Sequence, residues 1–269
     1  MRYFLHLAYN GYNYRGWQRQ TSSIGVQQLL EDTLSIIFKQ KITCLGCGRT
    51  DAMVHSVQYF VHFDLDTAFD FDLVFRLAKS LPHDIVVFEV IPMEIGNEHA
   101  RFDAIERSYS YFIHTDKDPY LHTLSSYYEY TNLDLAKMKQ AADLLKNYTD
   151  FRAFCLSPDR HNSTICHITD VRLYTNKQKN RLRFEISANR FLKGMIRIII
   201  AKLLEVGNDK LSIADFEAFL TTQERAVILK PAYPQGLYLS KVRYPFLDIP
   251  TRTEFWNIFN GIEWIEIKL

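Results

Sequence analysis

The stretch Gly46-Cys-Gly-Arg-Thr-Asp-Ala-Met-Val-His55 places one carboxylate, Asp51, between a basic residue and strand-like sequence. Directly after it, the side chains of residues 57–63 alternate at the period of a half-buried strand, which predicts a turn that leads into a sheet. Such turns present functional groups from a rigid support. The alternative is an Asx turn, in which Asp51 only bonds its own backbone. Asp51 is our candidate for a catalytic carboxylate.

A second stretch, Lys193 to Val206, is apolar around nearly its whole circumference, which predicts a buried helix. Arg197 lies inside it, and a guanidinium keeps its charge and is rarely buried without a partner. Asp51 is the acid that a turn is best placed to deliver. Alternatively, Arg197 reaches solvent along its stem or bonds backbone carbonyls, and the residues alone leave both interpretations open.

Composition indicates a globular protein. The 269 residues, 47% hydrophobic and 14% aromatic, suffice for a sizeable core and for two domains of ordinary size. No apolar run is long enough to cross a bilayer and no signal-peptide core is present, so we expect a cytoplasmic protein without a membrane partner. The net charge of +1 neither demands nor excludes a nucleic-acid partner.

The four cysteines do not resemble a disulfide framework. Cys44 and Cys47 have the spacing of a metal knuckle, but Cys155 and Cys166 supply no second pair of that spacing. We therefore expect reduced, packed thiols and no metal site.

Two further segments have the composition of a nucleic-acid contact. Tyr9 to Gln20 interleaves glycines and aromatic residues with Arg15 and Arg19, which suits stacking on bases and contact with phosphates; a tyrosine-rich hairpin is the alternative. Tyr109 and Tyr111 share one face of a predicted strand that ends near His114. They form either a stacking platform or two core tyrosines.

Periodicity predicts the remaining elements and the fold class. Helices are expected at 26–38, 74–81, 135–145, 193–206 and 212–221, and strands at 3–9, 57–63, 85–91, 171–173, 182–188 and 236–242. Each half repeats a strand, an aromatic turn and a helix. We predict an α+β protein with two similar domains, 1–106 and 107–269, each a mainly antiparallel sheet backed by helices, with an active-site cleft between them.

The order of these motifs resembles the tRNA pseudouridine synthase A family across nearly the whole chain. The matching blocks are Tyr9-Asn-Gly-Tyr-Asn-Tyr-Arg-Gly-Trp-Gln-Arg-Gln20, Gly48-Arg-Thr-Asp-Ala-Met-Val-His55, His99-Ala-Arg-Phe-Asp-Ala104 with Tyr109 and Tyr111, Asn189-Arg-Phe-Leu-Lys-Gly-Met-Ile-Arg197, and Pro231-Ala232 with Gly236-Leu-Tyr-Leu239.

The resemblance implies the pseudouridine synthase fold, a homodimer without cofactor or metal, and isomerisation of uridine in the anticodon arm of tRNA, at positions 38 to 40. It implies that Asp51 is the catalytic aspartate, that Arg197 pairs with it and that Tyr109 stacks on the target base. We also count Tyr109 as a catalytic candidate, as the relay for the proton that leaves C5 of the base. Arg49 would enter the space left by the flipped nucleotide. We expect phosphate contacts from Arg15, Arg19, Arg107 and Lys193.

Two features depart from the family pattern. Met53 stands where the family box has glycine, and a positive φ there would cost about 1 to 2 kcal/mol. The tail from Pro245 to Leu269 is longer than is typical and ends in strand-like sequence. The alternative function is therefore a catalytically silent RNA-binding or RNA-folding paralogue, in which Met53 has disabled the turn.

Overall fold

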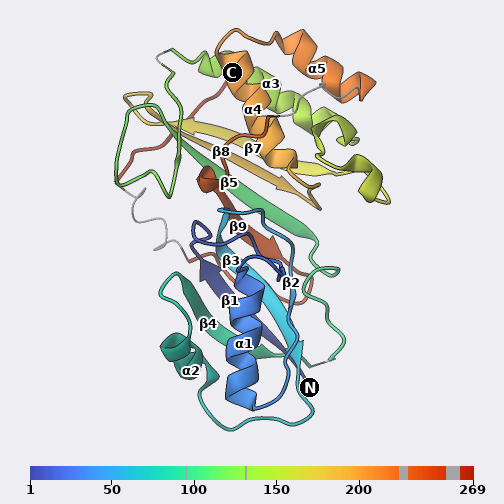
Figure 1. Ribbon diagram of the computed structural model, residues 1–269. Coiled ribbons are helices and arrows are strands. Elements are labelled where there is room, and N and C mark those ends of the chain that lie inside the picture. The colour runs from blue at the N-terminus through green and yellow to red at the C-terminus, as the bar shows by residue number, and fades with distance from the viewer. Residues whose placement is uncertain (95, 131, 224–229, 253–260) are drawn as a thin grey trace. The chain divides into compact units, whose positions relative to one another are not determined.

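The computed structural model describes residues 1–94, 96–130, 132–223, 230–252 and 261–269 (Figure 1). The chain divides into two compact units, each built from two stretches of sequence. The first unit comprises Met1–Arg107 and Tyr238–Phe255, and the second comprises Ser108–Leu237 and Trp256–Leu269. The domain assignment 1–106 and 107–269 stays a prediction, because compact units do not by themselves establish independent domains.

The sheet of the first unit has the strand order β4-β1-β3-β9. β1 (Arg2–Tyr9) pairs in the antiparallel direction with both β3 (His55–Asp64) and β4 (Ile85–Pro92). β9 (Leu237–Arg243) pairs with β3 in the parallel direction. The two-residue strand β2 (Leu45–Gly46) also pairs with β3, antiparallel, and the chain then enters the Asp51 turn.

Strand β3 is not half-buried as its alternation predicted, because nine of its ten residues are buried. The polar side chains that alternate with the apolar ones have hydrogen-bond partners on segments distant in sequence. Gln58 Nε2 donates to the carbonyl of Ile249 at 2.9 Å, and His62 Nδ1 accepts from the amide of Ala100 at 3.1 Å. Burial of a polar side chain is tolerated when it is hydrogen-bonded, which is why alternation misled here.

The described part of the first unit contains two helices. α1 (Val26–Phe38) has the bounds that periodicity predicted, and Figure 1 shows it lying across the strands of this unit. α2 (Leu73–Ser80) begins after Asp72, whose side chain accepts from the amide of Phe75. It begins and ends one residue earlier than the predicted range 74–81, and Pro82 follows two residues after its end.

The sheet of the second unit has the strand order β10-β7-β8-β5, with β6 beside β5. β7 (Ile168–Thr175) pairs antiparallel with β8 (Arg181–Ala188) and with β10 (Ile265–Glu266), the strand expected in the tail. β5 (Glu106–His114) pairs in parallel with β6 (Ser126–Tyr127). No sequence signal predicted β6, since two residues carry no readable period.

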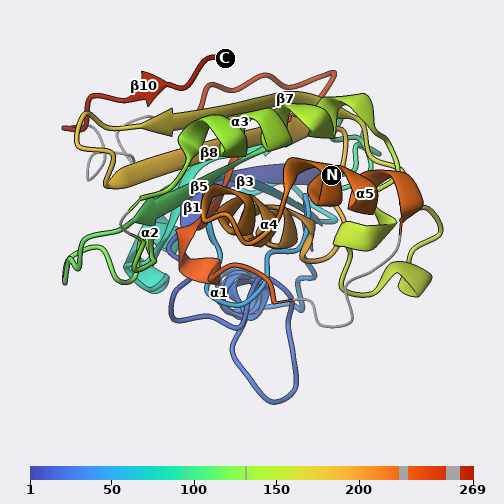
Figure 2. The same ribbon diagram turned by 90° about the horizontal axis from the view of Figure 1, so that it is seen from above.

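The helices of the second unit are α3 (Leu135–Leu144), α4 (Met195–Gly207) and α5 (Ile213–Thr222), which Figure 2 shows gathered together. Nine of the thirteen residues of α4 are buried, which confirms the buried helix. It begins two residues later than predicted because Gly194, at φ +73°, precedes it in the left-handed conformation. Short 3-10 helices are η1 (Leu145–Asn147), η2 (Arg152–Phe154), η3 (Pro158–Arg160) and η4 (Pro234–Gly236).

The described residues thus form an α+β protein with mixed, mostly antiparallel strand pairing and helices against the strands, as predicted. The parallel pairs β3–β9 and β5–β6 join segments that no local pattern connects. None of the helices in the described ranges has the length and apolar character that a bilayer crossing requires.

Candidate active site

Asp51 lies in the turn between β2 and β3 and is half-buried. Side chains from strands β1 and β3 hold the part of the turn that precedes Asp51. Tyr59 Oη on β3 donates to the carbonyl of Gly48 at 2.7 Å, and the hydroxyls of Tyr9 and Thr50 share a hydrogen bond of 2.9 Å. The carboxylate is therefore carried by backbone that two buried aromatic side chains hold in place.

The segment after β1 packs against the same turn. The amide of Trp17 donates to the carbonyl of Thr50 at 3.2 Å, and the amide of Met53 donates to the carbonyl of Tyr14 at 3.1 Å. Gly16, at φ +88°, approaches so closely that a Cβ there would lie 2.4 Å from the Thr50 oxygen. Tyr14 and Trp17 are buried, which favours a supporting role for these rings over base stacking.

Met53 adopts φ +64°, the left-handed conformation that favours glycine. The position where the family box has glycine therefore does require a positive φ in this chain. The turn closes nonetheless, because the amide of Val54 donates to the carbonyl of Asp51 at 3.2 Å. The strain of about 1 to 2 kcal/mol is accommodated by surrounding hydrogen bonds without loss of the turn.

Arg107 supports the beginning of the turn. Its guanidinium donates to the carbonyl of Cys47 from Nη2 at 2.7 Å and from Nε at 3.1 Å, and to the carbonyl of Arg101 at 2.7 Å. The sequence suggested a phosphate contact for Arg107. It gave no signal for these hydrogen bonds to backbone carbonyls, since the partners lie up to 60 residues away.

Cys44 and Cys47 are both buried in the first unit. Burial raises the pKa of the Cys44 thiol well above its usual value and that of Cys47 to about 11. Both thiols are therefore protonated at neutral pH. Within the described part of the chain, His, Cys, Asp and Glu side chains form no group of three or more suited to a metal ion.

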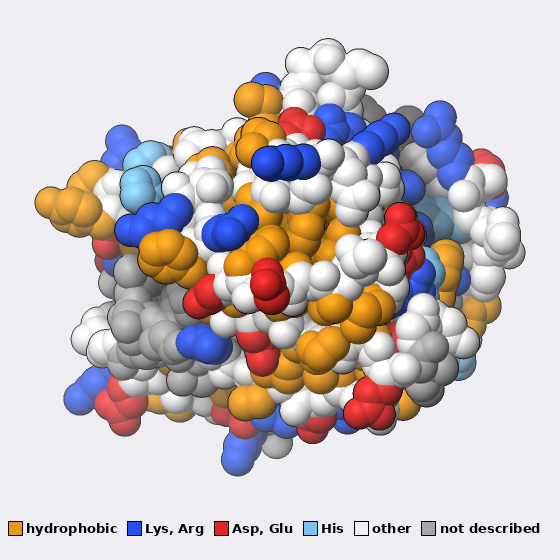
Figure 3. All heavy atoms as spheres, turned by 90° about the horizontal axis from the view of Figure 1, so that it is seen from below, with side chains coloured by type: hydrophobic (Ala, Val, Ile, Leu, Met, Phe, Trp, Pro, Cys, Tyr) orange, Lys and Arg blue, Asp and Glu red, His pale blue; other side chains and the backbone are white. Residues whose placement is uncertain are grey.

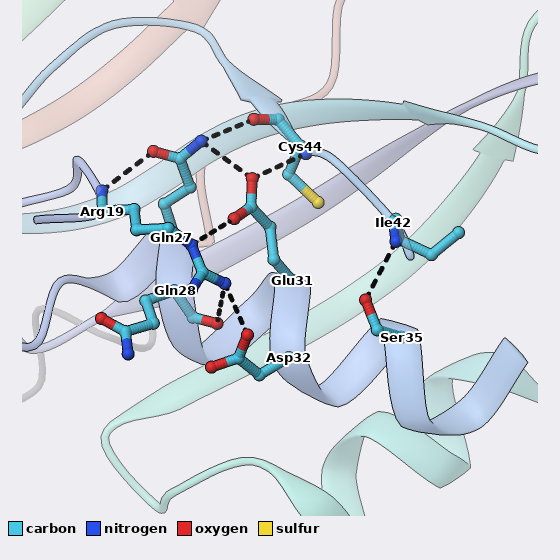
Figure 4. Close-up of polar contacts among 8 residues, drawn as sticks. All are labelled: Arg19, Gln27, Gln28, Glu31, Asp32, Ser35, Ile42 and Cys44. Carbon is cyan, nitrogen blue, oxygen red and sulfur yellow. Dashed lines mark hydrogen bonds and ion pairs between the residues drawn. The ribbon is translucent and has the colours of Figure 1, made fainter. Parts of the chain in front are cut away.

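Arg19, expected to contact phosphate, is held by acids of α1 (Figure 4). Arg19 Nε lies 2.7 Å from Glu31 Oε2, and Nη2 lies 2.5 Å from Asp32 Oδ1. Glu31 Oε1 also accepts from Gln27 Nε2 at 3.0 Å and from the amide of Cys44 at 3.0 Å. Glu31 thus joins three segments around the Asp51 turn, and its place on the buried face of α1 was the only sequence signal for it.

Arg15 and Arg49 are both exposed on the first unit. Arg49 lies within the turn, two residues before Asp51. Arg15 lies in the supporting segment, where its amide donates to the carbonyl of Ile24 at 3.0 Å.

In the second unit, Arg197 is the third residue of α4 and is half-buried. Its Nε donates to the carbonyl of Ala232 at 2.7 Å, and the amide of Ala232 donates to the carbonyl of Arg197 at 2.9 Å. The segment that resembles the family's Pro-Ala block is therefore fastened to this arginine. The sequence-based alternative, in which Arg197 bonds a backbone carbonyl, describes one of its contacts.

Tyr109 and Tyr111 differ in exposure although both lie on β5. Tyr111 has no exposed surface, and its Oη donates to the carbonyl of Tyr233 at 2.7 Å. Burial raises its pKa well above the usual value, so it stays a neutral donor. Tyr109 is half-buried, with its ring edge-to-face against Phe191 at 5.2 Å. Tyr111 is a core tyrosine, whereas Tyr109 retains accessible surface.

Lys193 is exposed just before α4, and its carbonyl accepts from the amide of Leu156 at 3.0 Å. Of the predicted site residues, those at positions 15, 19, 49 and 51 belong to the first unit, and those at 109, 193 and 197 belong to the second. The pairing of Asp51 with Arg197 stays a prediction.

Known proteins match the chain along most of its length. Residues 141–245 match the model of a family described as tRNA pseudouridine synthase. The tRNA pseudouridine synthase A of Porphyromonas gingivalis is 40% identical over 247 residues, which cover 91% of this chain and 97% of that protein. Its counterpart from Azobacteroides pseudotrichonymphae is 38% identical with the same coverage, and one from Streptococcus pneumoniae is 32% identical over 90% of this chain and 98% of its own length.

Proposed function

We propose, for a chain that belongs to the tRNA pseudouridine synthase A family, that Asp51 opens the isomerisation of uridine to pseudouridine in the anticodon arm of tRNA, at positions 38 to 40. The enzyme class is that of its relatives, a tRNA pseudouridine synthase and therefore an isomerase. The observation that supports Asp51 is the turn itself, because hydrogen bonds from β1, β3 and the Tyr9–Gln20 segment fix the backbone on both sides of the half-buried carboxylate.

The reaction needs one carboxylate and a proton acceptor. The bond from C1′ to N1 breaks, uracil rotates while it is held, and C5 joins C1′. The proton on C5 leaves and N1 takes up a proton, so the product is an isomer of the substrate. Nothing is oxidised or added, so the steps balance without a redox cofactor. An ionised Asp51 serves equally as a nucleophile at C1′ of the sugar or at C6 of the base.

Arg197 is proposed to keep this carboxylate ionised in the enzyme–RNA complex. A guanidinium at hydrogen-bonding distance favours the anion, whereas burial alone would favour the neutral acid. The contact between Arg197 Nε and the Ala232 carbonyl supports this role, since it fixes the stem of a side chain whose forked guanidinium suits a carboxylate.

The target uridine is stacked in RNA and must be extruded, at a cost of a few kcal/mol. We propose that Tyr109 stacks on the extruded base and that Arg49 enters the vacated space. Their exposure supports these roles, because Tyr109 is half-buried and Arg49 is exposed beside Asp51.

The remaining contacts are proposed to go to phosphates. Arg15 and Lys193 are exposed and suit this role directly. Arg19 is exposed as well, but it already forms ion pairs with Glu31 and Asp32. We therefore expect it to contribute less to phosphate binding than Arg15 or Lys193. We further propose that the protein is a homodimer, that it acts on tRNA in the cytoplasm and that it needs no cofactor.

The test is the replacement of Asp51 by Asn in the full chain. The variant keeps the side-chain size and should fold normally, yet release no tritium from tRNA labelled at C5 of uridine. Asp70→Asn, which changes an exposed aspartate of the same unit, is the matched control and should release tritium at the wild-type rate. Retained turnover in Asp51→Asn would remove Asp51 from its role.

The second candidate function is a silent RNA-binding or RNA-folding paralogue, which the left-handed Met53 beside Asp51 favours. It predicts that the wild-type protein binds tRNA but releases no tritium. The same assay therefore separates the two functions before any substitution is made.

A further inference from the structure

Hydrophobic side chains reach the surface at many places among charged ones, as Figure 3 shows for one face. Exposure alone therefore does not mark a binding residue. Tyr233 in the second unit is different because its exposed aromatic ring is held by ring stacking and by hydrogen bonds to its backbone. Just over half of its surface, 54%, is exposed, and it lies directly before η4.

The ring of Tyr233 is the outer member of a row of three tyrosines. It stacks on Tyr128 with ring centroids 5.1 Å apart and an interplanar angle of 30°. Tyr128 in turn stacks on Tyr130 at 5.8 Å and 5°. Tyr128 and Tyr130 are half-buried, so the row, which we call the tyrosine stack, places two half-buried rings behind the exposed ring of Tyr233.

The backbone of Tyr233 is fixed on both sides by tyrosine hydroxyls. Its amide donates to Tyr128 Oη at 3.0 Å, and its carbonyl accepts from Tyr111 Oη at 2.7 Å. Tyr111 is fully buried, so this anchor belongs to the core. A ring held in this way loses little conformational entropy when a ligand stacks on it.

The position of Tyr233 connects it to the proposed catalytic arginine. The preceding residue, Ala232, exchanges two hydrogen bonds with Arg197, one through the guanidinium and one through the backbone. Lys230, three residues before Tyr233, is exposed and adds a positive charge on the same segment. The exposed ring is thus presented by the segment that Arg197 holds.

We propose that Tyr233 stacks on an unpaired base of the tRNA substrate, adjacent to the target uridine. The proposal rests on the proposed function, which makes RNA the substrate of this site. A nucleobase is the occupant favoured here because its π face matches an exposed, preorganised aromatic ring at the end of a stack. Tyr109 would hold the extruded uracil, and Tyr233 would hold a neighbour that stays outside.

The experiment measures tRNA binding in the Asp51→Asn background, where turnover does not complicate the dissociation constant. Tyr233→Ala should weaken binding about tenfold or more, as expected for the loss of one stacked base, whereas Tyr233→Phe keeps the ring and should bind within about twofold of the parent. Tyr120→Ala is the matched control, because Tyr120 is a still more exposed tyrosine of the same unit, and it should leave binding unchanged.

A second measurement locates the base. An abasic substitution is moved through the anticodon arm, and binding is measured with Tyr and with Ala at position 233. At one nucleotide the two changes should be strongly non-additive, because each removes one half of the same stack. The slope of binding against salt concentration should be the same for both proteins, since a stacking contact neutralises no phosphate.

Three results would overturn the proposal. They are unchanged binding in Tyr233→Ala, additive effects at every nucleotide, and a change of oligomeric state in Tyr233→Ala, which would assign the ring to a contact between copies of the chain. Failure of Asp51 as the catalytic group is read separately, from tritium release, so the two proposals can fail independently.

Discussion

Arg19 Nε lies 2.7 Å from Glu31 Oε2, and this ion pair fastens the segment that supports the Asp51 turn to helix α1. The Glu31 side chain is nearly buried, with 9% of its surface exposed, whereas that of Asp32, which binds the same arginine, is 53% exposed. Only Glu31 also holds the amide of Cys44, five residues before Arg49 at the head of the turn. Glu31 and Asp32 thus both bind Arg19, but of the two only Glu31 also binds the segment that leads into the turn.

Glu31→Gln should therefore damage both stability and catalysis. The loss of a nearly buried charge pair, partly screened at the arginine end, should lower the free energy of unfolding by about 1 to 2 kcal/mol. A looser turn should lower kcat about tenfold with a smaller change in KM. Denaturant unfolding and tritium-release kinetics measure the two effects.

Asp32→Asn is the control for that substitution. Its exposed ion pair should contribute no more than about 0.5 kcal/mol, and kcat should stay at the wild-type value. Equal losses of kcat in the two variants would show that the charge on Arg19, and not the anchoring of Cys44, is what matters.

Gly16→Ala should disrupt the turn by contact, not only by conformation. Gly16 and Gly96 both have a positive φ, +88° and +77°, so alanine is strained at either position. A Cβ at residue 16 would lie 2.4 Å from the carbonyl oxygen of Thr50, whereas a Cβ at residue 96 would have no atom within 4 Å. Gly96→Ala should lose about 1 kcal/mol of stability and no activity, while Gly16→Ala should lose more stability and most of the activity.

Met53→Gly should leave the isomerisation rate within about threefold of wild type. Glycine adopts φ +64° without the strain of about 1 to 2 kcal/mol, but it increases the entropy of the unfolded chain by a comparable free energy. The net change in stability should therefore be below about 1 kcal/mol. Activity in Met53→Gly together with silence in the wild type would instead establish the silent paralogue.

Arg197→Met should keep α4 apolar and lower kcat by at least about a hundredfold, because a preorganised cationic donor is lost from the reacting centre. The Ala232 carbonyl also loses its side-chain donor, which should cost about 1 kcal/mol of stability. Arg197→Lys keeps the charge but not the forked geometry, so its kcat should lie between those of the wild type and Arg197→Met. A wild-type rate in Arg197→Met would contradict the proposed ion pair.

Stability should decrease as the pH falls from about 6.5 to about 4, in part through His62. Burial, with help from Arg2 and His99, lowers the pKa of His62 to about 4, so the folded protein holds it neutral while the unfolded chain binds a proton below about 6.5. His62→Asn retains an acceptor for the Ala100 amide and cannot titrate. Its unfolding free energy should change less steeply over this range, by up to about 1.4 kcal/mol per pH unit. An unchanged slope would mean that folding does not lower the pKa of His62.

Much of the local structure could be read from the sequence. Helices α1 and α2 matched their apolar spacing, and α4 matched its apolar circumference, because each reflects burial recorded within a few neighbouring residues. The Asp51 turn was recognisable for the same reason, since its glycines, its carboxylate and the following strand are contiguous.

The supports of the site could not be read in this way. Glu31 meets Cys44, Arg107 meets Cys47, Arg197 meets Ala232, and Tyr233 is held by Tyr111 and Tyr128, each across 13 to 122 residues. The alternation of β3 likewise gave no sign that Gln58 is buried, because its hydrogen-bond partners, Val242 and Ile249, lie 184 and 191 residues later in the chain. The sequence by itself determined which segments become helices and strands and which carboxylate leads into the sheet. Only the tertiary structure decided what holds that carboxylate in place, because hydrogen-bond partners distant along the chain leave no periodic trace in it.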